Sequence, residues 1–354
     1  MKTINYILIN GKQIGPGRPT YIVAEMSANH NQDFDQAVLI LKKAKEAGAD
    51  AVKIQTYTPQ TLTINCDNEY FSIGNGTIWA GQNLYQLYEK AFTPWEWQPQ
   101  LKAVAHELGI DFFSTPFDTT AVDFLEDLDL PAYKVASFEL VDLQLVKRIA
   151  ETGKPVILST GMADLSEIGE AVQLIRSTGN HQLALLKCTS AYPAAPEDIN
   201  LRTMAHLQAT FGVPVGLSDH TLGITVPVVA VALGASIVEK HFTLSRDIPG
   251  PDATFSLEPH EFRQMVDSIR MAEKALGKVS FAVTRQESAS RIFRRSLFVV
   301  EQMKQGDVFT RQNIRSIRPG YGMHTRHFEE ILGRKASRDI ERGTPLAWDL
   351  VGDV

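Results

Sequence analysis

Short apolar runs recur along the first 280 residues, and each is followed by an amphipathic stretch. In the stretch 33–48, apolar residues return every three or four positions, which is the period of one helix face. The short runs are rich in β-branched residues and predict strands. They lie at 21–26, 50–55, 110–115, 132–137, 155–160, 182–189, 214–219 and 236–242.

Apolar strands that alternate with helices are typical of a parallel sheet. Eight such units in about 255 residues predict an α/β fold of the (β/α)8 TIM-barrel type. Gly48, Gly109 and Gly234 each stand just before a strand, where a glycine commonly ends the preceding helix. An open, doubly wound sheet is the main alternative.

One connection is longer than the others. About 55 residues separate the second and third strands, and they include Tyr70, Trp79, Tyr85 and Tyr88. A connection this long in a compact domain is usually functional or disordered, and its aromatic content argues against disorder. We therefore expect a lid that faces a substrate at the mouth of the barrel.

The pattern changes after Gly277. Residues 278–291 are polar and are predicted to form a linker, and residues 292–354 contain short strands and turns. The expected organisation is therefore a catalytic barrel over 1–277, a linker over 278–291 and a small second domain over 292–354.

Composition narrows the partners. The 354 residues are 44% hydrophobic and carry a net charge of −6, which gives the chain no global attraction to nucleic acid or to an anionic membrane. The sequence has no signal-peptide core, and no apolar run approaches the roughly 18–20 residues that span a bilayer. The two cysteines, Cys66 and Cys188, are too few for a disulfide framework. We expect a cytoplasmic protein.

The predicted strands end in polar residues, at the face where TIM barrels carry their active sites. A serine or threonine there is often only a helix cap. Lys53 and Lys134, however, stand inside apolar strands, where an unpaired ammonium is costly to bury. Two lysines that converge on one mouth imply an anion between them. The strand-end residues are Glu25, Lys53, Thr115, Lys134, Ser137, Ser159, Thr189, Ser218, His220 and His241.

The lysines and hydroxyls suit a phosphate or a phosphocarboxylate. A lysine that forms a Schiff base, as in class I aldolases, is the alternative, and spacing alone does not exclude it.

His220 and His241 end the seventh and eighth strands, which are neighbours in a closed barrel. The eighth strand also lies next to the first, which ends at Glu25. Two imidazoles with a carboxylate or water form a site for Mn²⁺, Zn²⁺, Fe²⁺ or Co²⁺.

Eight segments, in order, resemble the sialic acid synthase family, whose members condense phosphoenolpyruvate with an N-acetylated amino sugar. The resemblance runs from about residue 20 to the end. The segments are "AEMSANHN" (24–31), "KIQTY" (53–57), "STPFD" (114–118), "YKVASFE" (133–139), "STGM" (159–162), "LKCTSAYP" (186–193), "GLSDHT" (216–221) and "EKHFTL" (239–244).

The resemblance implies roles for named residues. His220 and His241 bind a divalent metal, usually Mn²⁺, with Mg²⁺ or Co²⁺ as alternatives. Glu25 and Glu139 are the catalytic carboxylates, and Ser190 and Tyr192 lie near the substrates. Some members have Asn where this chain has Ser190. The phosphoenolpyruvate contacts fall on Lys53, Thr115, Lys134, Ser137, Ser159 and Ser218.

The family also implies a C-terminal antifreeze-like (SAF) domain. An arginine of that domain, Arg318 here, reaches the active site of the partner subunit in the family, which implies a domain-swapped homodimer.

Members of the family make neuraminic, legionaminic or pseudaminic acids. The lid segment and the second-strand region look most like the pseudaminic acid branch, whereas "IPGPDATFSL" (248–257) also resembles the other two branches.

Two alternative functions come from other classes of protein. They are a non-catalytic sugar-binding protein and a metal-dependent hydrolase, although the first strand lacks the HxH pair that is common in such hydrolases.

Overall fold

The computed structural model describes residues 6–74 and 78–352. Residues 1–5, at the start of the segment predicted to lack a signal-peptide core, lie outside the described residues, as do residues 75–77 of the predicted lid and residues 353–354. The chain divides into two compact units, Met1–Gly277 and Lys278–Val354. Within the described residues, no helix is long and apolar enough to cross a membrane.

The first unit is a closed barrel of eight parallel strands, which confirms the predicted fold class. The strand order is β10-β3-β4-β5-β6-β7-β8-β9, so the last strand pairs with the first. Each predicted strand matches an observed one. They are β3 (Tyr21–Glu25), β4 (Ala51–Thr56), β5 (Asp111–Pro116), β6 (Tyr133–Val135), β7 (Val156–Ser159), β8 (Leu183–Cys188), β9 (Val215–Asp219) and β10 (Ile237–His241).

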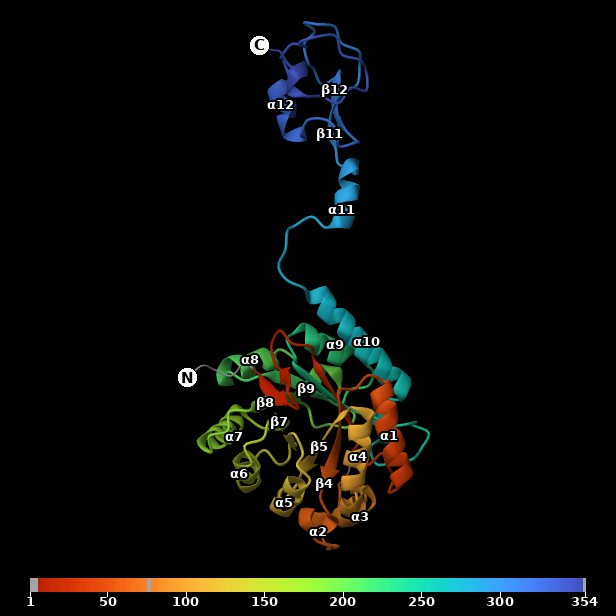
Figure 1. The fold of residues 1–354 in the computed structure, drawn as a ribbon, viewed down its shortest axis with the longest axis vertical. Helices are drawn as coiled ribbons and strands as arrows, with labels where there is room; N and C mark the ends of the chain where they lie inside the picture. Colours follow the sequence, from red (N-terminus) through yellow and green to blue (C-terminus); the bar gives the residue numbers. More distant parts are fainter. Residues whose placement is uncertain (1–5, 75–77, 353–354) are drawn as a thin grey trace. The chain divides into compact units, whose positions relative to one another are not determined.

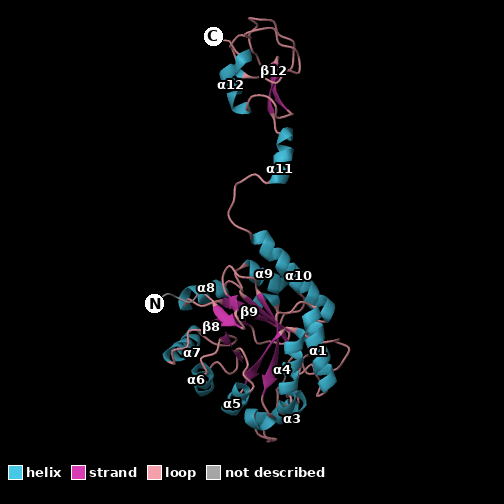
Figure 2. Cartoon of the chain, in the orientation of Figure 1, coloured by secondary structure: helices cyan, strands magenta, loops and turns pink. Residues whose placement is uncertain are grey.

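Helices surround the strands (Figures 1 and 2). Gly109 ends α4 in the left-handed conformation, with φ 62°, as its position before a strand predicts. The helices of this unit are α1 (Phe34–Glu46), α2 (Pro59–Leu62), α3 (Leu84–Ala91), α4 (Gln98–Leu108), α5 (Thr119–Asp127), α6 (Leu143–Glu151), α7 (Leu165–Ser177), α8 (Thr203–Phe211), α9 (Thr225–Ala232) and α10 (Pro259–Leu276).

The strands bury both faces, and successive side chains alternate between them. In β10, Val238 belongs to the large core between strands and helices, whereas Ile237 belongs to a smaller core inside the barrel. The inner core also contains Val23 of β3, Ala51 of β4 and Phe113 of β5. Residues two positions further along each strand therefore point into the barrel at its carboxyl-terminal mouth.

A hairpin that the sequence did not reveal covers the other end of the barrel. It consists of β1 (Ile7–Ile9) and β2 (Lys12–Ile14), which pair antiparallel. Its isoleucines join the inner core. Lys12 also forms a 2.8 Å ion pair with Asp111, whose carboxylate accepts a hydrogen bond from Tyr21 Oη. The barrel is thus closed at this end, and ligands must enter at the carboxyl-terminal mouth.

The second unit has its own core, which includes Leu297, Phe309 and Ile314. A short helix lies within the predicted linker. The elements are α11 (Arg285–Ser290), β11 (Ser296–Val299), β12 (Ile314–Ile317), which pairs antiparallel with β11, and α12 (Phe328–Ile331).

Candidate active site

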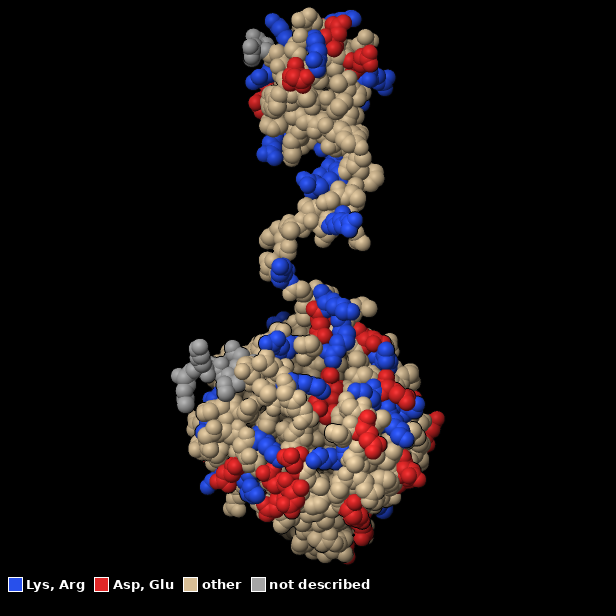
Figure 3. Space-filling view, in the orientation of Figure 1, with Lys and Arg blue, Asp and Glu red and all other residues tan. Residues whose placement is uncertain are grey.

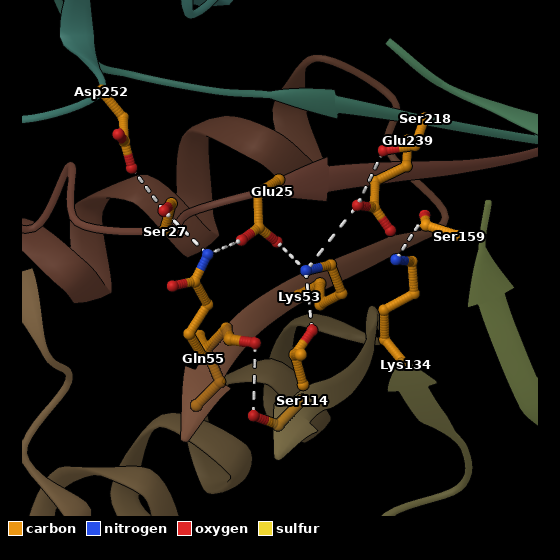
Figure 4. Close-up of polar contacts among 12 residues, drawn as sticks. Glu25, Ser27, Lys53, Gln55, Ser114, Lys134, Ser159, Ser218, Glu239 and Asp252 are labelled. Atoms are coloured by element: carbon orange, nitrogen blue, oxygen red, sulfur yellow. Dashed lines mark hydrogen bonds and ion pairs between the residues drawn. The ribbon is translucent and has the colours of Figure 1, made fainter. Parts of the chain in front are cut away.

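Glu25 and Lys53 form the centre of the site (Figure 4). They are paired in register, Glu25 at the end of β3 and Lys53 within β4, and Lys53 Nζ lies 2.7 Å from Glu25 Oε2. Gln55 donates a hydrogen bond to Glu25 Oε1 at 2.9 Å, and Lys53 donates one to Thr115 Oγ1 at 3.0 Å. Burial raises the pKa of Glu25, and the charge of Lys53 offsets only part of this effect.

Glu239, on β10, is a second buried carboxylate at this centre. Its Oε1 lies 3.7 Å from Lys53 Nζ and accepts a 3.4 Å hydrogen bond from Ser218. Burial opposes its charge, but Lys134 and Lys53 hold the pKa of Glu239 below its usual value. The two converging lysines are thus partly neutralised by the protein itself, which the sequence argument for an intervening anion did not foresee.

Lys134 differs from Lys53. Its ammonium donates hydrogen bonds to Ser159 Oγ at 2.6 Å and to the Val135 carbonyl at 3.0 Å, and it forms no ion pair within the described residues. Burial lowers the pKa of Lys134. A buried cation whose hydrogen-bond partners are neutral is a place where a ligand anion would be strongly stabilised.

Two of the predicted hydroxyl groups, Thr115 and Ser159, contact these lysines directly. Ser137 follows β6 and accepts a 3.0 Å hydrogen bond from the backbone N–H of Gly161. A Cβ at Gly161 would lie 2.3 Å from Ser190 Oγ and 2.7 Å from Ser137 Oγ, so a larger residue there would displace these hydroxyls. Thr115, Ser137, Ser159 and Ser218 are all buried.

His220 and His241 lie together on the neighbouring strand ends, with ring centroids 5.4 Å apart. His241 is paired in register with Glu25. The ring of Tyr192 packs on His220 with centroids 4.3 Å apart, and the ring of Phe255 packs on His241 with centroids 4.9 Å apart. Burial, followed by the charge of His220, holds the pKa of His241 well below its usual value. His241 is therefore neutral at neutral pH, as a metal ligand must be.

The histidine pair fits a divalent metal by two observations. His220 Nδ1 contacts the Thr189 carbonyl at 3.0 Å, an outer contact that leaves Nε2 for a ligand. His241 Nδ1 is buried without a hydrogen-bond partner in the described part of the chain. Among all described residues of the chain, no three or more His, Cys, Asp or Glu side chains form a cluster that could bind a metal. Further ligands to a metal on the two histidines would therefore come from water or substrate.

A cavity of about 420 Å³ opens beside the histidines. Glu139, Tyr192 and His241 line its floor, and burial raises the pKa of Glu139 to about 7. The long connection between β4 and β5 supplies much of its wall, as expected of the predicted lid. That wall is largely apolar and includes Tyr57, Leu62, Ile73, Trp79, Leu84, Leu87, Tyr88 and Ala91.

Several residues of the site were missed by the sequence argument. Ser27 donates a 2.5 Å hydrogen bond to Asp252 and accepts one from Gln55, which links the loop after β10 to Glu25. Two-residue alternation would have found Glu239, because it lies two positions before the inward-facing His241. Ser27 and Asp252 lie in loops and had no such signal.

Arg318 belongs to the second unit, where it follows β12 and is exposed. Its contribution to the site stays a prediction.

Surface charge does not define a second site on the visible face of the barrel unit. Lys and Arg are interspersed there with Asp and Glu (Figure 3).

The fold and the site are those of a barrel enzyme, in which buried lysines, a histidine pair and a cavity meet at one mouth. The chain belongs to the NeuB family, whose model matches residues 40–281, and a SAF domain matches residues 294–352.

The similar proteins agree with this assignment. Pseudaminic acid synthase from Helicobacter pylori is 46% identical over 333 residues, which cover 94% of this chain and 98% of the relative. N,N'-diacetyllegionaminic acid synthase from Legionella pneumophila is 36% identical and covers 96% of this chain and 97% of the relative. The N-acetylneuraminic acid synthetase of Leptospira borgpetersenii, crystallised with citrate, has a TM-score of 0.72 and 31% identity, covering 80% and 94% of the two chains.

Proposed function

We propose that this protein is a pseudaminic acid synthase, which condenses phosphoenolpyruvate with 2,4-diacetamido-2,4,6-trideoxy-altrose and water to give pseudaminic acid and phosphate. The single observation that carries the reaction class is the buried, unpaired Lys134 beside the Glu25–Lys53 pair in a NeuB-family barrel. Three pseudaminic acid synthases, each 46% identical to this chain, support this member of the family.

Phosphoenolpyruvate is proposed to bind at the lysines. Lys134 and Lys53 supply the positive charge, and Ser159 and Thr115 already hydrogen-bond to these ammonium groups. The remaining contacts come from Ser137 and Ser218. For Lys134, whose present partners are neutral, an anion adds the opposite charge that this buried ammonium lacks.

The sugar is proposed to occupy the 420 Å³ cavity. Glu139 and Tyr192 are polar residues in its lining. Ser190 Oγ lies 3.8 Å from Cys188 Sγ, at the end of β8. The apolar lid matches a sugar that carries a C6 methyl group and two acetamido methyl groups. A hydroxyl on C6, as in N-acetylmannosamine, would match this largely apolar wall less well than a methyl group, although an apolar wall rejects an added hydroxyl only weakly.

His220 and His241 would hold a divalent cation, proposed to be Mn²⁺, with Mg²⁺ or Co²⁺ as alternatives. When bound, it supplies Lewis-acid polarisation and orientation of the acceptor aldehyde. The protein's own side chains position the other reactant. The lysines orient phosphoenolpyruvate so that its C3 faces the aldehyde carbon.

In the reaction, C3 of phosphoenolpyruvate bonds to the aldehyde carbon, and the aldehyde oxygen takes up a proton. Water adds at C2 and loses a proton, and the C–O bond to phosphate then breaks. Positive charge develops at C2 in between, and the carboxylates Glu25 and Glu139 can stabilise it. Glu25 is proposed to accept the proton, because Lys53 and Gln55 hold its carboxylate in place at the centre of the site.

We also propose a homodimer in which the SAF domain of one subunit delivers Arg318 to the barrel of the other. The charges favour such docking, because residues 278–354 carry 14 Lys and Arg against 9 Asp and Glu, whereas residues 1–277 carry 21 against 32.

A cytoplasmic location is proposed as well. Within the described residues both cysteines are free thiols, which is typical of a reducing compartment.

The reaction class is tested by phosphate release from phosphoenolpyruvate labelled with ¹⁸O at the bridging position. Sugar-dependent release of phosphate that retains the label supports C–O cleavage. Borohydride trapping of a lysine–substrate adduct would support the Schiff-base aldolase instead. Ligand-induced stabilisation without phosphate release would indicate a sugar-binding protein.

A further inference from the structure

A buried ion pair lies directly behind the two histidines. Asp219 and Lys240 are paired in register on β9 and β10, with Lys240 Nζ 2.5 Å from Asp219 Oδ2, and neither side chain is exposed at all. Because side chains alternate along a strand, these two point away from the barrel interior, whereas Ser218 and Glu239, one position earlier, point into it.

The pair also binds the turn that follows His220. Asp219 accepts hydrogen bonds from the Thr221 backbone N–H at 3.1 Å and from Thr221 Oγ1 at 2.9 and 3.0 Å. Lys240 donates a hydrogen bond to the Thr221 carbonyl. Asp219, Lys240 and Thr221 therefore form one closed cluster, which we call the back cluster.

This cluster lies where the sheet stops. The pairing of β9 with β10 ends at Asp219 and Lys240, so His220 stands one residue beyond the ladder. Its carbonyl accepts a hydrogen bond from the Ala194 N–H at 3.0 Å, but no strand-to-strand pairing between β9 and β10 holds it beside His241. The back cluster joins the residue before His220 and the residue after it to the residue before His241.

We infer that Asp219, Lys240 and Thr221 are positioning residues that fix the spacing of His220 and His241 for metal binding. This inference rests on the proposed metal role of the histidines. A buried ion pair is not by itself strong support for stability, because apolar or neutral residues of similar volume often replace it without loss. Its placement around both histidines gives it a specific use.

The test replaces both charges at once. In the double variant Asp219→Asn, Lys240→Met, the shapes are kept and no unpaired charge remains, but the Thr221 carbonyl loses its donor. The full-length protein is titrated with Mn²⁺, with free Mn²⁺ followed by electron paramagnetic resonance, and folding is checked by Tm and near-UV circular dichroism. We expect at least a 10-fold weaker Kd for Mn²⁺, because loss of outer-shell partners typically costs about 10- to 100-fold in metal affinity. We also expect a lower kcat with an unchanged KM for phosphoenolpyruvate.

Tyr21→Phe is the matched control. It removes a buried 2.8 Å hydrogen bond between β3 and β5 at the opposite end of the barrel, so it should leave the Mn²⁺ affinity unchanged. A double variant that binds Mn²⁺ as tightly as the unsubstituted protein overturns the inference. Failure of the unsubstituted protein to bind Mn²⁺ overturns the metal proposal as well.

Thr221→Val decides the question if the double variant does not fold, because it removes a single hydroxyl from the same cluster. A loss of Mn²⁺ affinity of about 3-fold or more, within the range of one lost hydrogen bond, supports the inference. An unchanged affinity contradicts it.

Discussion

Glu25 Oε2 lies 2.7 Å from Lys53 Nζ at the mouth of the barrel, and both side chains are almost completely buried. Such a pair costs desolvation energy that its attraction only partly returns, so it is weak support for stability. Its position beside Lys134 and the histidine pair gives it a chemical use instead.

Replacing Lys53 or Lys134 by Met should weaken phosphoenolpyruvate binding. Each substitution removes charge-assisted hydrogen bonds to the anion, and the KM for phosphoenolpyruvate should rise by about 10- to 100-fold. Steady-state kinetics measure this. Lys12→Met, whose ammonium pairs with Asp111 at the closed end of the barrel, should leave KM unchanged. Unaltered KM and kcat in both site variants would show that the anion binds elsewhere.

His241→Ala should abolish the dependence of activity on added Mn²⁺ and reduce kcat by at least about 100-fold, because one of the two protein ligands is lost. The measurement is activity after chelation and readdition of Mn²⁺. His260, on α10, is exposed, and His260→Ala is the control. Full activity of His241→Ala with normal metal dependence would rule out the metal site.

Glu139 should give the pH profile an inflection near pH 7. Burial raises its pKa to about 7, so the group is neutral below that pH and ionised above it. The carboxylate accepts hydrogen bonds from the sugar more strongly, and kcat/KM for the sugar should therefore rise as pH increases through 7. Glu139→Gln should lack this rise, whereas Glu151→Gln, a change at an exposed residue of α6, should keep it. An inflection that persists in Glu139→Gln assigns it to another group.

His30 should make the protein sensitive to acid. It is fully buried beside Thr93, and burial lowers its pKa to about 4 from 6.5. Between pH 6.5 and 4, His30 binds a proton in the unfolded chain but stays neutral in the folded one, so stability is lost as pH falls through this range. The loss between pH 7 and 5 is about 2 kcal/mol.

Urea unfolding at the two pH values measures this effect. His30→Gln should be less stable at pH 7 but should lose about 2 kcal/mol less on acidification. An equal pH dependence in both proteins would mean that another group causes the acid sensitivity.

Much of the barrel could be predicted because its signals are local. Each predicted strand overlaps an observed one, since apolar runs, glycine caps and amphipathic stretches mark the boundaries of each unit. The hairpin β1–β2 was not predicted, because strands of three residues are too short to show an alternation of apolar and polar residues.

The site was predicted at the level of strand ends and less well at the level of partners. The structure brings Lys53, Lys134, His220 and His241 to one mouth, but the partner of a buried charge depends on register. The carboxylates beside Lys53 and the Asp219–Lys240 pair follow from which strands adjoin and by how much they are shifted. The residues Ser27 and Asp252 meet only through the three-dimensional course of two loops.

The most direct test of the proposed function is mass spectrometry of the products from a competition of acceptors. Purified protein, Mn²⁺ and phosphoenolpyruvate are supplied with equal amounts of N-acetylmannosamine, the legionaminic acid precursor and 2,4-diacetamido-2,4,6-trideoxy-altrose. Pseudaminic acid should be the main nine-carbon product, formed with one phosphate per molecule. A main product derived from either of the other two sugars, or the absence of any condensation product, would contradict it.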